Sequence, residues 1–268
     1  MTELVHVKID ADIAWITLDS PHNRNALSRE LTRELLAGLE RCRSNDVRVV
    51  VLSGTGRVFC SGADLVERRQ STDGPTVDQD DAAIRMMTTL YSFPKPLVGL
   101  INGHVRAGGL GLLACCDIAV APDWSTYAFS EVHLGLVPAV ISVPVLAKMD
   151  RNAARRYFLT GEAFSATTAA TVGLLTAAVP DCQLNKTVDE LVAELLKGSP
   201  AAQAVVKDEL LRRPGDLEAA RADFDRLEAL SLRMFASKEA GEGMAAFAEK
   251  RPPRWVNTRA PRDVGTTA

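Results

Sequence analysis

Residues 101–112 read INGHVRAGGLGL, and this stretch decides the fold. We expect a buried strand to end here and to pass through small residues into an apolar helix. Such a turn leaves backbone N–H groups without partners at the positive end of a helix dipole. These donors suit an anion or a developing oxyanion, but glycines also serve packing and turn geometry alone. The stretch by itself therefore leaves both interpretations open.

Two further segments narrow the choice. A second small-residue turn, GTGRVFCSGADL at 54–65, follows the apolar run 47–52, and a third, FSEVHLGLVP at 129–138, places Glu131 ahead of a Gly/Pro turn. Together the three resemble the crotonase (enoyl-CoA hydratase/isomerase) superfamily. The resemblance runs from an expected strand at 13–18 to the segment GMAAFAEKRP at 243–252, and so covers nearly the whole chain.

The resemblance implies an α/β crotonase fold, in which repeated ββα units form a spiral core. We expect that core, with an acyl-CoA site, over residues 1–198, and a C-terminal helical oligomerisation region over 199–268. The family also implies a homotrimer, often doubled to a hexamer. In the last third, apolar residues recur at helical spacing, and periodicity alone does not separate a core face from a subunit interface. They are Leu217, Ala220, Phe224, Leu227, Leu230 and Met234.

Composition favours a folded protein with small-molecule or protein partners. The chain has 268 residues, 47% of them hydrophobic, which is enough for a sizeable core. Its 31 basic and 34 acidic residues are interspersed, which argues against nucleic-acid binding and a polybasic membrane surface. No run approaches the ~20 apolar residues of a membrane helix. With no targeting pattern at the N-terminus, we expect a cytoplasmic protein.

The five cysteines fall mostly inside apolar runs, not at paired or metal-ligand spacings. We expect reduced core residues and no metal site. No Walker or Rossmann motif is present, so we expect no cofactor, with CoA arriving as part of the substrate thioester. The cysteines are Cys42, Cys60, Cys115, Cys116 and Cys182.

Local signals predict several element boundaries. Alternating strands and helices through about residue 145 indicate an α/β arrangement, and the chain is mainly helical from Asn152 onward. The polar stretch 67–81 is expected to be a loop, either a solvated connector or a lid over the acyl group. Helix caps are predicted at Ser28, Asn152, Ser165 and Ser199.

The resemblance also implies catalytic groups. The N–H groups of Ala63 and Gly108 would polarise the thioester carbonyl. Hydratases of this family use two glutamates, and the position of the first is Gly111 in this chain, which cannot move a proton. The second is retained as Glu131, and one carboxylate can serve as general base and general acid in turn.

Candidate CoA contacts follow the same motifs, although each basic residue is equally well explained as surface charge. Arg57 lies where crotonases place a basic residue near the nucleotide phosphates, and Arg24 lies in the loop that skirts pantetheine and adenine. Phe247 and Lys250 match a C-terminal Phe-x-x-Lys pair that reaches CoA. The other substrate-binding candidates are Ala26, Ser61, Asp64, Leu65, Arg106, Gly109 and Gly111, of which Asp64 is also a candidate turn or helix-cap residue.

These features favour an enoyl-CoA hydratase. The segments 130–142 and 155–162 resemble a subgroup associated with methylglutaconyl-CoA hydration in leucine breakdown, whose members also carry glycine at the position of Gly111. Arg106 either meets a carboxylate on the acyl tail or pairs with a neighbouring loop or subunit. His104 and His133 have no partner at motif spacing and are expected to be structural.

Three alternatives stay open. A Δ3-Δ2 isomerase would use the single glutamate to move a proton between carbons, and a non-catalytic scaffold would bind acyl-CoA without turnover. Hydrolase or decarboxylase chemistry is also compatible with the residues, because fold-level kinship does not fix the reaction type.

Overall fold

Two sheets form the centre of the molecule, for which a computed structural model describes residues 3–44, 46–70, 77–210 and 216–256. The larger sheet has the order β1-β2-β3-β5-β7-β10. Only its first pair is antiparallel, a hairpin whose turn residues Ala11 and Asp12 have φ of 44° and 71°. The strands are β1 (Val5–Asp10), β2 (Ile13–Leu18), β3 (Val49–Gly54), β5 (Leu97–Leu100), β7 (Ile118–Pro122) and β10 (Ala177–Val179).

The smaller sheet has the order β4-β6-β8-β9. Its strands are β4 (Val58–Cys60), β6 (His104–Arg106), β8 (Thr126–Ala128) and β9 (Phe164–Ser165), of which only β9 runs antiparallel to its neighbour. From β3 to β8, each strand of the large sheet is followed along the chain by one of the small sheet, and helical segments come after each such pair. The predicted α/β class with repeated ββα units is thus confirmed.

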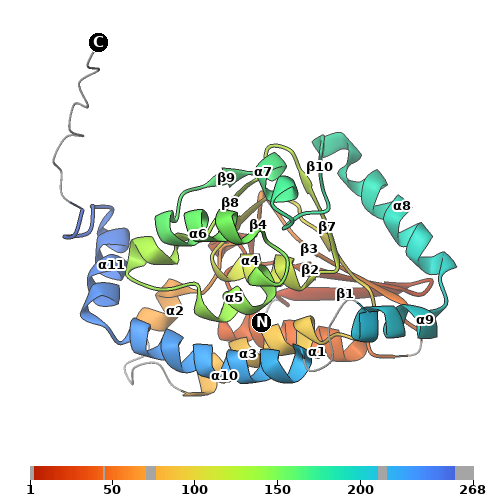
Figure 1. Cartoon of the computed structure of the whole chain (residues 1–268), viewed down its shortest axis with the longest axis horizontal. Coiled ribbons are helices and arrows are strands. Elements are labelled where there is room, and N and C mark those ends of the chain that lie inside the picture. The colour runs from red at the N-terminus through yellow and green to blue at the C-terminus, as the bar shows by residue number, and fades with distance from the viewer. Residues whose placement is uncertain (1–2, 45, 71–76, 211–215, 257–268) are drawn as a thin grey trace, which may run out of the picture.

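Helices cover both faces of the large sheet (Figure 1). On one face, α1 (Arg29–Arg41), α3 (Val77–Tyr91), α4 (Gly108–Cys115) and α5 (Ala139–Leu146) belong to the main hydrophobic core. On the other, α8 (Leu184–Lys197) buries Val188 and Val192 against strand residues such as Val51 and Val98. Burial on both faces explains why the central parallel strands β3 and β5 are rich in valine and leucine without polar alternation.

Three of the four predicted helix caps are confirmed. Ser28 Oγ accepts the N–H of Leu31 at the start of α1, and Ser165 and Ser199 cap α7 (Ala166–Thr171) and α9 (Pro200–Val205) in the same way. The prediction at Asn152 is wrong, because Asp150 caps α6 (Arg151–Thr160), two residues earlier. Both side chains can cap, and their spacing does not show which of them precedes the first turn.

The loop predicted over 67–81 is wrong at both ends. Residues 67–70 belong to α2 (Leu65–Gln70) and 77–81 to α3, while 71–76 lie outside the described residues. Asp64 starts α2, since its Oδ1 accepts the N–H groups of Val66 and Glu67 at 3.0 and 3.1 Å. A polar composition does not distinguish a loop from a solvent-facing helix that has its own cap.

The C-terminal helices α10 (Asp216–Phe235) and α11 (Lys238–Glu249) pack on the rest of the chain. The middle of the apolar stripe on α10 is core: Phe224 is buried and lies edge-on to Tyr91 of α3, with ring centroids 6.1 Å apart. Leu230 and Met234 are partly exposed. The division at residue 198 and the oligomerisation role stay predictions.

Short helical segments complete the chain. They are the 3-10 turns η1 (Pro21–Asn23), η2 (Ser130–Leu134) and η3 (Asp181–Gln183), and the π-helical η4 (Val206–Leu210). Lys207 of η4 is buried and paired with Asp117 at 2.6 Å. Four of the five free cysteines are buried as predicted, whereas Cys182 is exposed. Among the described residues, no helix is long and apolar enough to cross a bilayer, and no metal-ligand cluster occurs.

Candidate active site

Two backbone turns bring the amide groups of Ala63 and Gly108 together. An ideal Cβ on Gly108 would lie 3.7 Å from the nitrogen of Ala63, and one on Gly62 would lie 3.0 Å from the nitrogen of Gly108. Leu27 fixes the first turn, because its N–H donates to Gly62 O at 2.8 Å. Within the described part of the chain, neither amide N–H has an acceptor. The pair can therefore hold an oxygen that develops negative charge.

The second turn is strained at Ala107, the residue before α4. Its φ of 46° and ψ of −123° are rare for a residue with a Cβ. The conformation is held from both sides, since Ala107 N–H donates to Ala128 O at 3.0 Å and Ala107 O accepts the N–H of Leu110 at 2.9 Å. Backbone strain of this kind is concentrated at functional sites, where the surrounding structure maintains it.

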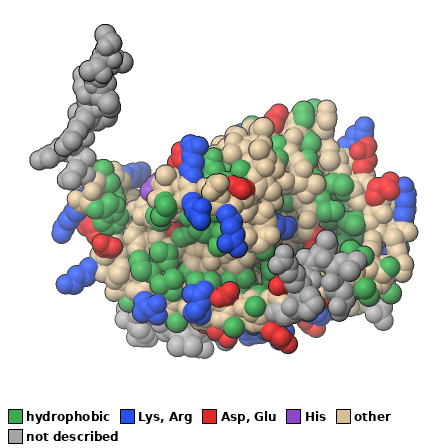
Figure 2. All heavy atoms as spheres, viewed as in Figure 1, with side chains coloured by type: hydrophobic (Ala, Val, Ile, Leu, Met, Phe, Trp, Pro, Cys, Tyr) green, Lys and Arg blue, Asp and Glu red, His purple; other side chains and the backbone are tan. Residues whose placement is uncertain are grey.

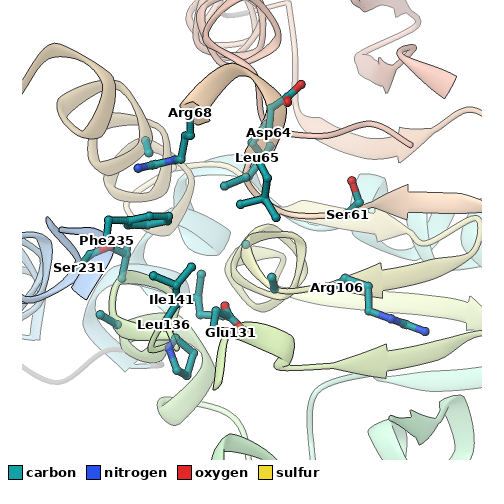
Figure 3. A pocket seen from close by; sticks show the side chains of 18 of the residues that line it. Ser61, Asp64, Leu65, Arg68, Arg106, Glu131, Leu136, Ile141, Ser231 and Phe235 are labelled. Atoms are coloured by element: carbon teal, nitrogen blue, oxygen red, sulfur yellow. The ribbon is translucent and has the colours of Figure 1, made fainter. Parts of the chain in front are cut away.

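Both amides open into a cavity of about 450 Å³. Side chains of α1, α2, α3, η2, α5, α10 and α11 line it, and most of them are apolar (Figure 3). Its size and lining are those of a small-molecule site. Glu131 enters the same cavity from η2, which follows β8 directly.

Glu131 is partly exposed as a residue, but its carboxyl group lies deep. Oε2 is buried and has no hydrogen-bond partner among the described residues. Burial, only partly offset by a hydrogen bond from its own backbone N–H, raises the pKa of Glu131 from its usual 4.5 to about 7. Figure 3 shows the carboxyl beside Leu136 and Ile141. A buried carboxyl whose pKa lies near neutrality, with an oxygen free to bond a ligand, is suited to proton transfer.

The turn that carries Glu131 is supported by α11. A Cβ on Gly243 would lie 2.4 Å from the carbonyl carbon and oxygen of Leu134, and one on Gly135 would lie 2.7 Å from the carbonyl carbon of Glu239. The two backbones are thus in direct contact. No local sequence pattern predicts this contact, which joins residues about 100 positions apart.

The sequence and the fold of this chain are similar to those of known proteins. The sequence model described as enoyl-CoA hydratase/isomerase matches residues 8–258. The chain belongs to this family. A solved enoyl-CoA hydratase from Mycobacterium avium is 41% identical, covers 96% of this chain and 100% of that one, and gives a TM-score of 0.84.

Two relatives of this family member are similar over most of their length. Enoyl-CoA hydratase domain-containing protein 3, mitochondrial, of Rattus norvegicus is 33% identical over 246 residues, which are 90% of this chain and 80% of that protein. Hydroxycinnamoyl-CoA hydratase-lyase of Pseudomonas fluorescens is 31% identical over 210 residues, 76% of each chain. The names of all three proteins refer to CoA thioesters.

In this hydratase/isomerase family member, Gly111 does not line the cavity, contrary to the prediction. A Cβ there would lie 2.7 Å from Ile141 Cγ2 and 2.7 Å from Met87 Cε, so Gly111 is packed behind these two side chains. Gly109 is similarly enclosed, with Cys60 O at 2.7 Å from its Cβ position. A carboxylate at position 111 has no room in this packing.

The proposed carboxylate-binding role of Arg106 is not supported. Its guanidinium donates to Thr126 O at 2.6 Å, Thr126 Oγ1 at 2.7 Å and Val105 O at 2.9 Å. Arg106 lies at the edge of the cavity, and Figure 3 shows its side chain pointing away from Glu131. Since three protein oxygens occupy the guanidinium, it holds β8 in place and does not face an acyl tail.

The two histidines are tied to the protein, as expected for structural residues. His104 Nδ1 lies 3.1 Å from Thr126 N, which donates to it. Burial and the neighbouring Arg106 and Arg57 lower the pKa of His104. His133 lines the cavity, but its Nε2 bonds Thr160 O at 2.8 Å.

The remaining predicted contacts divide into two groups. Arg57 lies outside the cavity lining, because its guanidinium stacks on Trp124 at 4.2 Å, and Ala26 is buried behind the cavity. Lys250 ends α11 with a left-handed φ of 53° and does not line the cavity. The residues that do line it are Arg24, Ser61, Asp64, Leu65 and Phe247, and Asp64 also caps α2.

Sequence reasoning missed a further group of cavity residues, Arg68 of α2 and Ser231 and Phe235 of α10. Phe235 comes directly after Met234, the last residue of the apolar stripe on α10. This position was the only feature of the sequence that could have indicated Phe235. Arg68 gave none, because it lies in the polar stretch that was predicted to be a loop.

Proposed function

We propose that this protein hydrates an α,β-unsaturated acyl-CoA, with Glu131 as its single acid–base group. One observation carries the proposal: Glu131, whose buried carboxyl oxygen has no partner among the described residues, lines the same cavity as the amides of Ala63 and Gly108, which have no acceptor there either. Family membership and the CoA thioesters named for its relatives support it.

The geometry gives each group a role. The two N–H groups donate to the thioester oxygen and stabilise the enolate as it forms. Ionised Glu131 takes a proton from water while the water oxygen bonds to the β-carbon. The resulting carboxylic acid then returns that proton to the α-carbon, which yields a 3-hydroxyacyl thioester and regenerates the carboxylate. A pKa near 7 suits a group that must be base and acid in one cycle.

A Δ3-Δ2 isomerase is the second candidate, and the packing at Gly111 favours it. Because Met87 and Ile141 fill the space where a side chain at Gly111 would go, α4 supplies no second carboxylate to hold a water. An isomerase needs only one proton carrier. A non-catalytic acyl-CoA scaffold would use the same cavity without turnover.

The subgroup likeness makes methylglutaconyl-CoA the first branched substrate to test, although Arg106 does not account for its recognition. We further propose that the protein needs no cofactor and works in the cytoplasm as a homotrimer or hexamer. Exposed apolar side chains support association, among them Leu159 at 79% and Phe247 at 59% exposure. Figure 2 shows hydrophobic side chains on the face that carries α5, α10 and α11.

The test combines absorbance of the conjugated enoyl thioester with mass detection of products in ¹⁸O-labelled water. Crotonyl-CoA, methylglutaconyl-CoA and a 3-enoyl-CoA are each mixed with the wild type, Glu131→Gln and the control Glu190→Gln, which changes an exposed residue of α8. A hydratase gives loss of absorbance and a labelled product, absent only in Glu131→Gln. Absorbance gained from the 3-enoyl substrate without label would establish the isomerase, and binding without turnover would establish the scaffold.

A further inference from the structure

A cation–π contact joins two of the residues that line the cavity. The guanidinium carbon of Arg68 lies 4.2 Å from the ring centroid of Phe235, and both residues line the cavity. Arg68 lies on α2, directly after the turn of Ala63, whereas Phe235 is the last residue of α10. The contact therefore joins a segment of the catalytic turn to the C-terminal helices.

The position of this pair relative to Glu131 indicates what it faces. Figure 3 shows Arg68, Phe235 and Ser231 together at one side of the cavity and Arg106 on the opposite side. The side chains of Leu65, Leu136 and Ile141 lie between these two sides. The labelled side chains between the Glu131 carboxyl and the stacked pair are thus aliphatic, while Glu228 of α10 also lines the cavity. Such a passage suits an alkyl chain and not the polar pantetheine or nucleotide of CoA.

Further polar groups lie at the side of the cavity that carries Ser61 and Arg106. Ser61 Oγ donates to Asn23 O at 3.2 Å, which places Ser61 against the loop of Arg24. Figure 3 shows Ser61 on the side away from Phe235. If CoA enters past Arg24, as the family resemblance implies, the thioester carbonyl lies at the amides and the acyl tail extends toward α2 and α10.

We propose that the Arg68–Phe235 stack is the end wall of the acyl subsite and limits the length of the acyl chain. This inference rests on the proposed binding of acyl-CoA but not on the reaction that follows. A tail that stops short of the stack fills the aliphatic passage. A longer tail must separate the guanidinium from the ring and bury alkyl carbon against a charge, which is unfavourable. The preferred substrates are therefore short-chain acyl-CoAs.

Binding of saturated acyl-CoAs tests the wall without turnover. Butyryl-, octanoyl- and dodecanoyl-CoA are titrated by calorimetry into the wild type, Arg68→Ala, Arg68→Lys and Phe235→Ala. Because one methylene in an apolar pocket is worth roughly tenfold or more in discrimination, both alanine variants should bind dodecanoyl-CoA at least about 10-fold more tightly than the wild type. The affinity of both alanine variants for butyryl-CoA should stay within about twofold of that of the wild type. Lysine stacks on an aromatic ring less well than arginine, so the affinity of Arg68→Lys for dodecanoyl-CoA should lie between those of the wild type and Arg68→Ala.

Two control variants distinguish a specific effect on chain-length preference from a general loss of folding or binding. Arg43→Ala removes a comparable stack on Phe93, 5.4 Å from that ring and outside the cavity, and should leave the chain-length preference unchanged. Phe235→Trp adds bulk and should shift the preference toward shorter chains, in the opposite direction to Phe235→Ala. Thermal melts confirm that each variant is folded.

The outcomes are distinguishable. Suppose that the wild type binds acyl-CoAs but all variants keep its chain-length preference, or bind all three ligands with equally reduced affinity. The assignment of the end wall is then wrong, while the proposed function stands. If the wild type binds no acyl-CoA, the proposed function fails and this assignment fails with it.

Discussion

The position that a Cβ on Gly111 would occupy lies 2.7 Å from Ile141 Cγ2. Alanine in place of a helical glycine ordinarily stabilises by up to about 1 kcal/mol. Here the clash should reverse the sign, so that Gly111→Ala lowers the free energy of unfolding by about 1–3 kcal/mol in urea titrations. In an Ile141→Ala background the cost should be smaller, because one of the two contacts at 2.7 Å is gone and only that to Met87 Cε remains. Equal costs in both backgrounds would contradict this packing.

The carboxyl of Glu131 should make stability depend on pH. Its pKa is about 7 in the folded protein against 4.5 when solvated, so folding favours the protonated form. This contribution is fully present below pH 4.5 and is lost as the pH rises through 7. Between pH 5 and 8, the wild type should lose about 2–3 kcal/mol more than Glu131→Gln, since one pKa unit corresponds to about 1.4 kcal/mol. Parallel stability curves from urea titrations would show that the carboxyl is ordinarily solvated.

Two glycines of α11 form a matched pair. A Cβ on Gly243 would meet Leu134 backbone atoms at 2.4 Å, whereas one on Gly241 would meet nothing within 4 Å. Gly243→Ala should therefore destabilise by about 1–3 kcal/mol, and it should lower kcat by displacing the turn of Glu131. Gly241→Ala should be neutral or stabilising by up to about 1 kcal/mol. Thermal melts measure the stability of the two variants, and turnover of crotonyl-CoA measures their kcat. Equal stability and equal kcat in Gly241→Ala and Gly243→Ala would refute the role of the contact between Gly243 and Leu134.

Arg106 should matter for stability and not for substrate choice. Removing its guanidinium in Arg106→Met leaves the carbonyl of Thr126 without this donor, at a cost of about 1–3 kcal/mol in the free energy of unfolding. The ratio of kcat/KM for methylglutaconyl-CoA to that for crotonyl-CoA should not change. A selective loss of methylglutaconyl-CoA turnover would restore the carboxylate-binding role.

Local sequence was sufficient for the parts of the site that consist of backbone. The turns of Ala63 and Gly108 are encoded by small residues between a strand and a helix, and Glu131 follows its strand directly. The two failures have different causes. The cap predicted at Asn152 is wrong because Asp150, another capping side chain, lies two residues earlier. The stretch 67–81 was predicted to be a loop from its polar composition, although Asp64, itself a candidate cap, starts α2 and α3 begins at Val77.

Residues adjacent in the chain are enough to predict the α/β class, the family and the three segments that meet at the cavity. The raised pKa of Glu131, the exclusion of a side chain at Gly111 and the direction of Arg106 follow from the three-dimensional packing alone. Those properties depend on burial and on atoms from distant elements. Packing brings Met87, Ile141 and Phe235 to the cavity from three separate helices, and no local pattern encodes that contact.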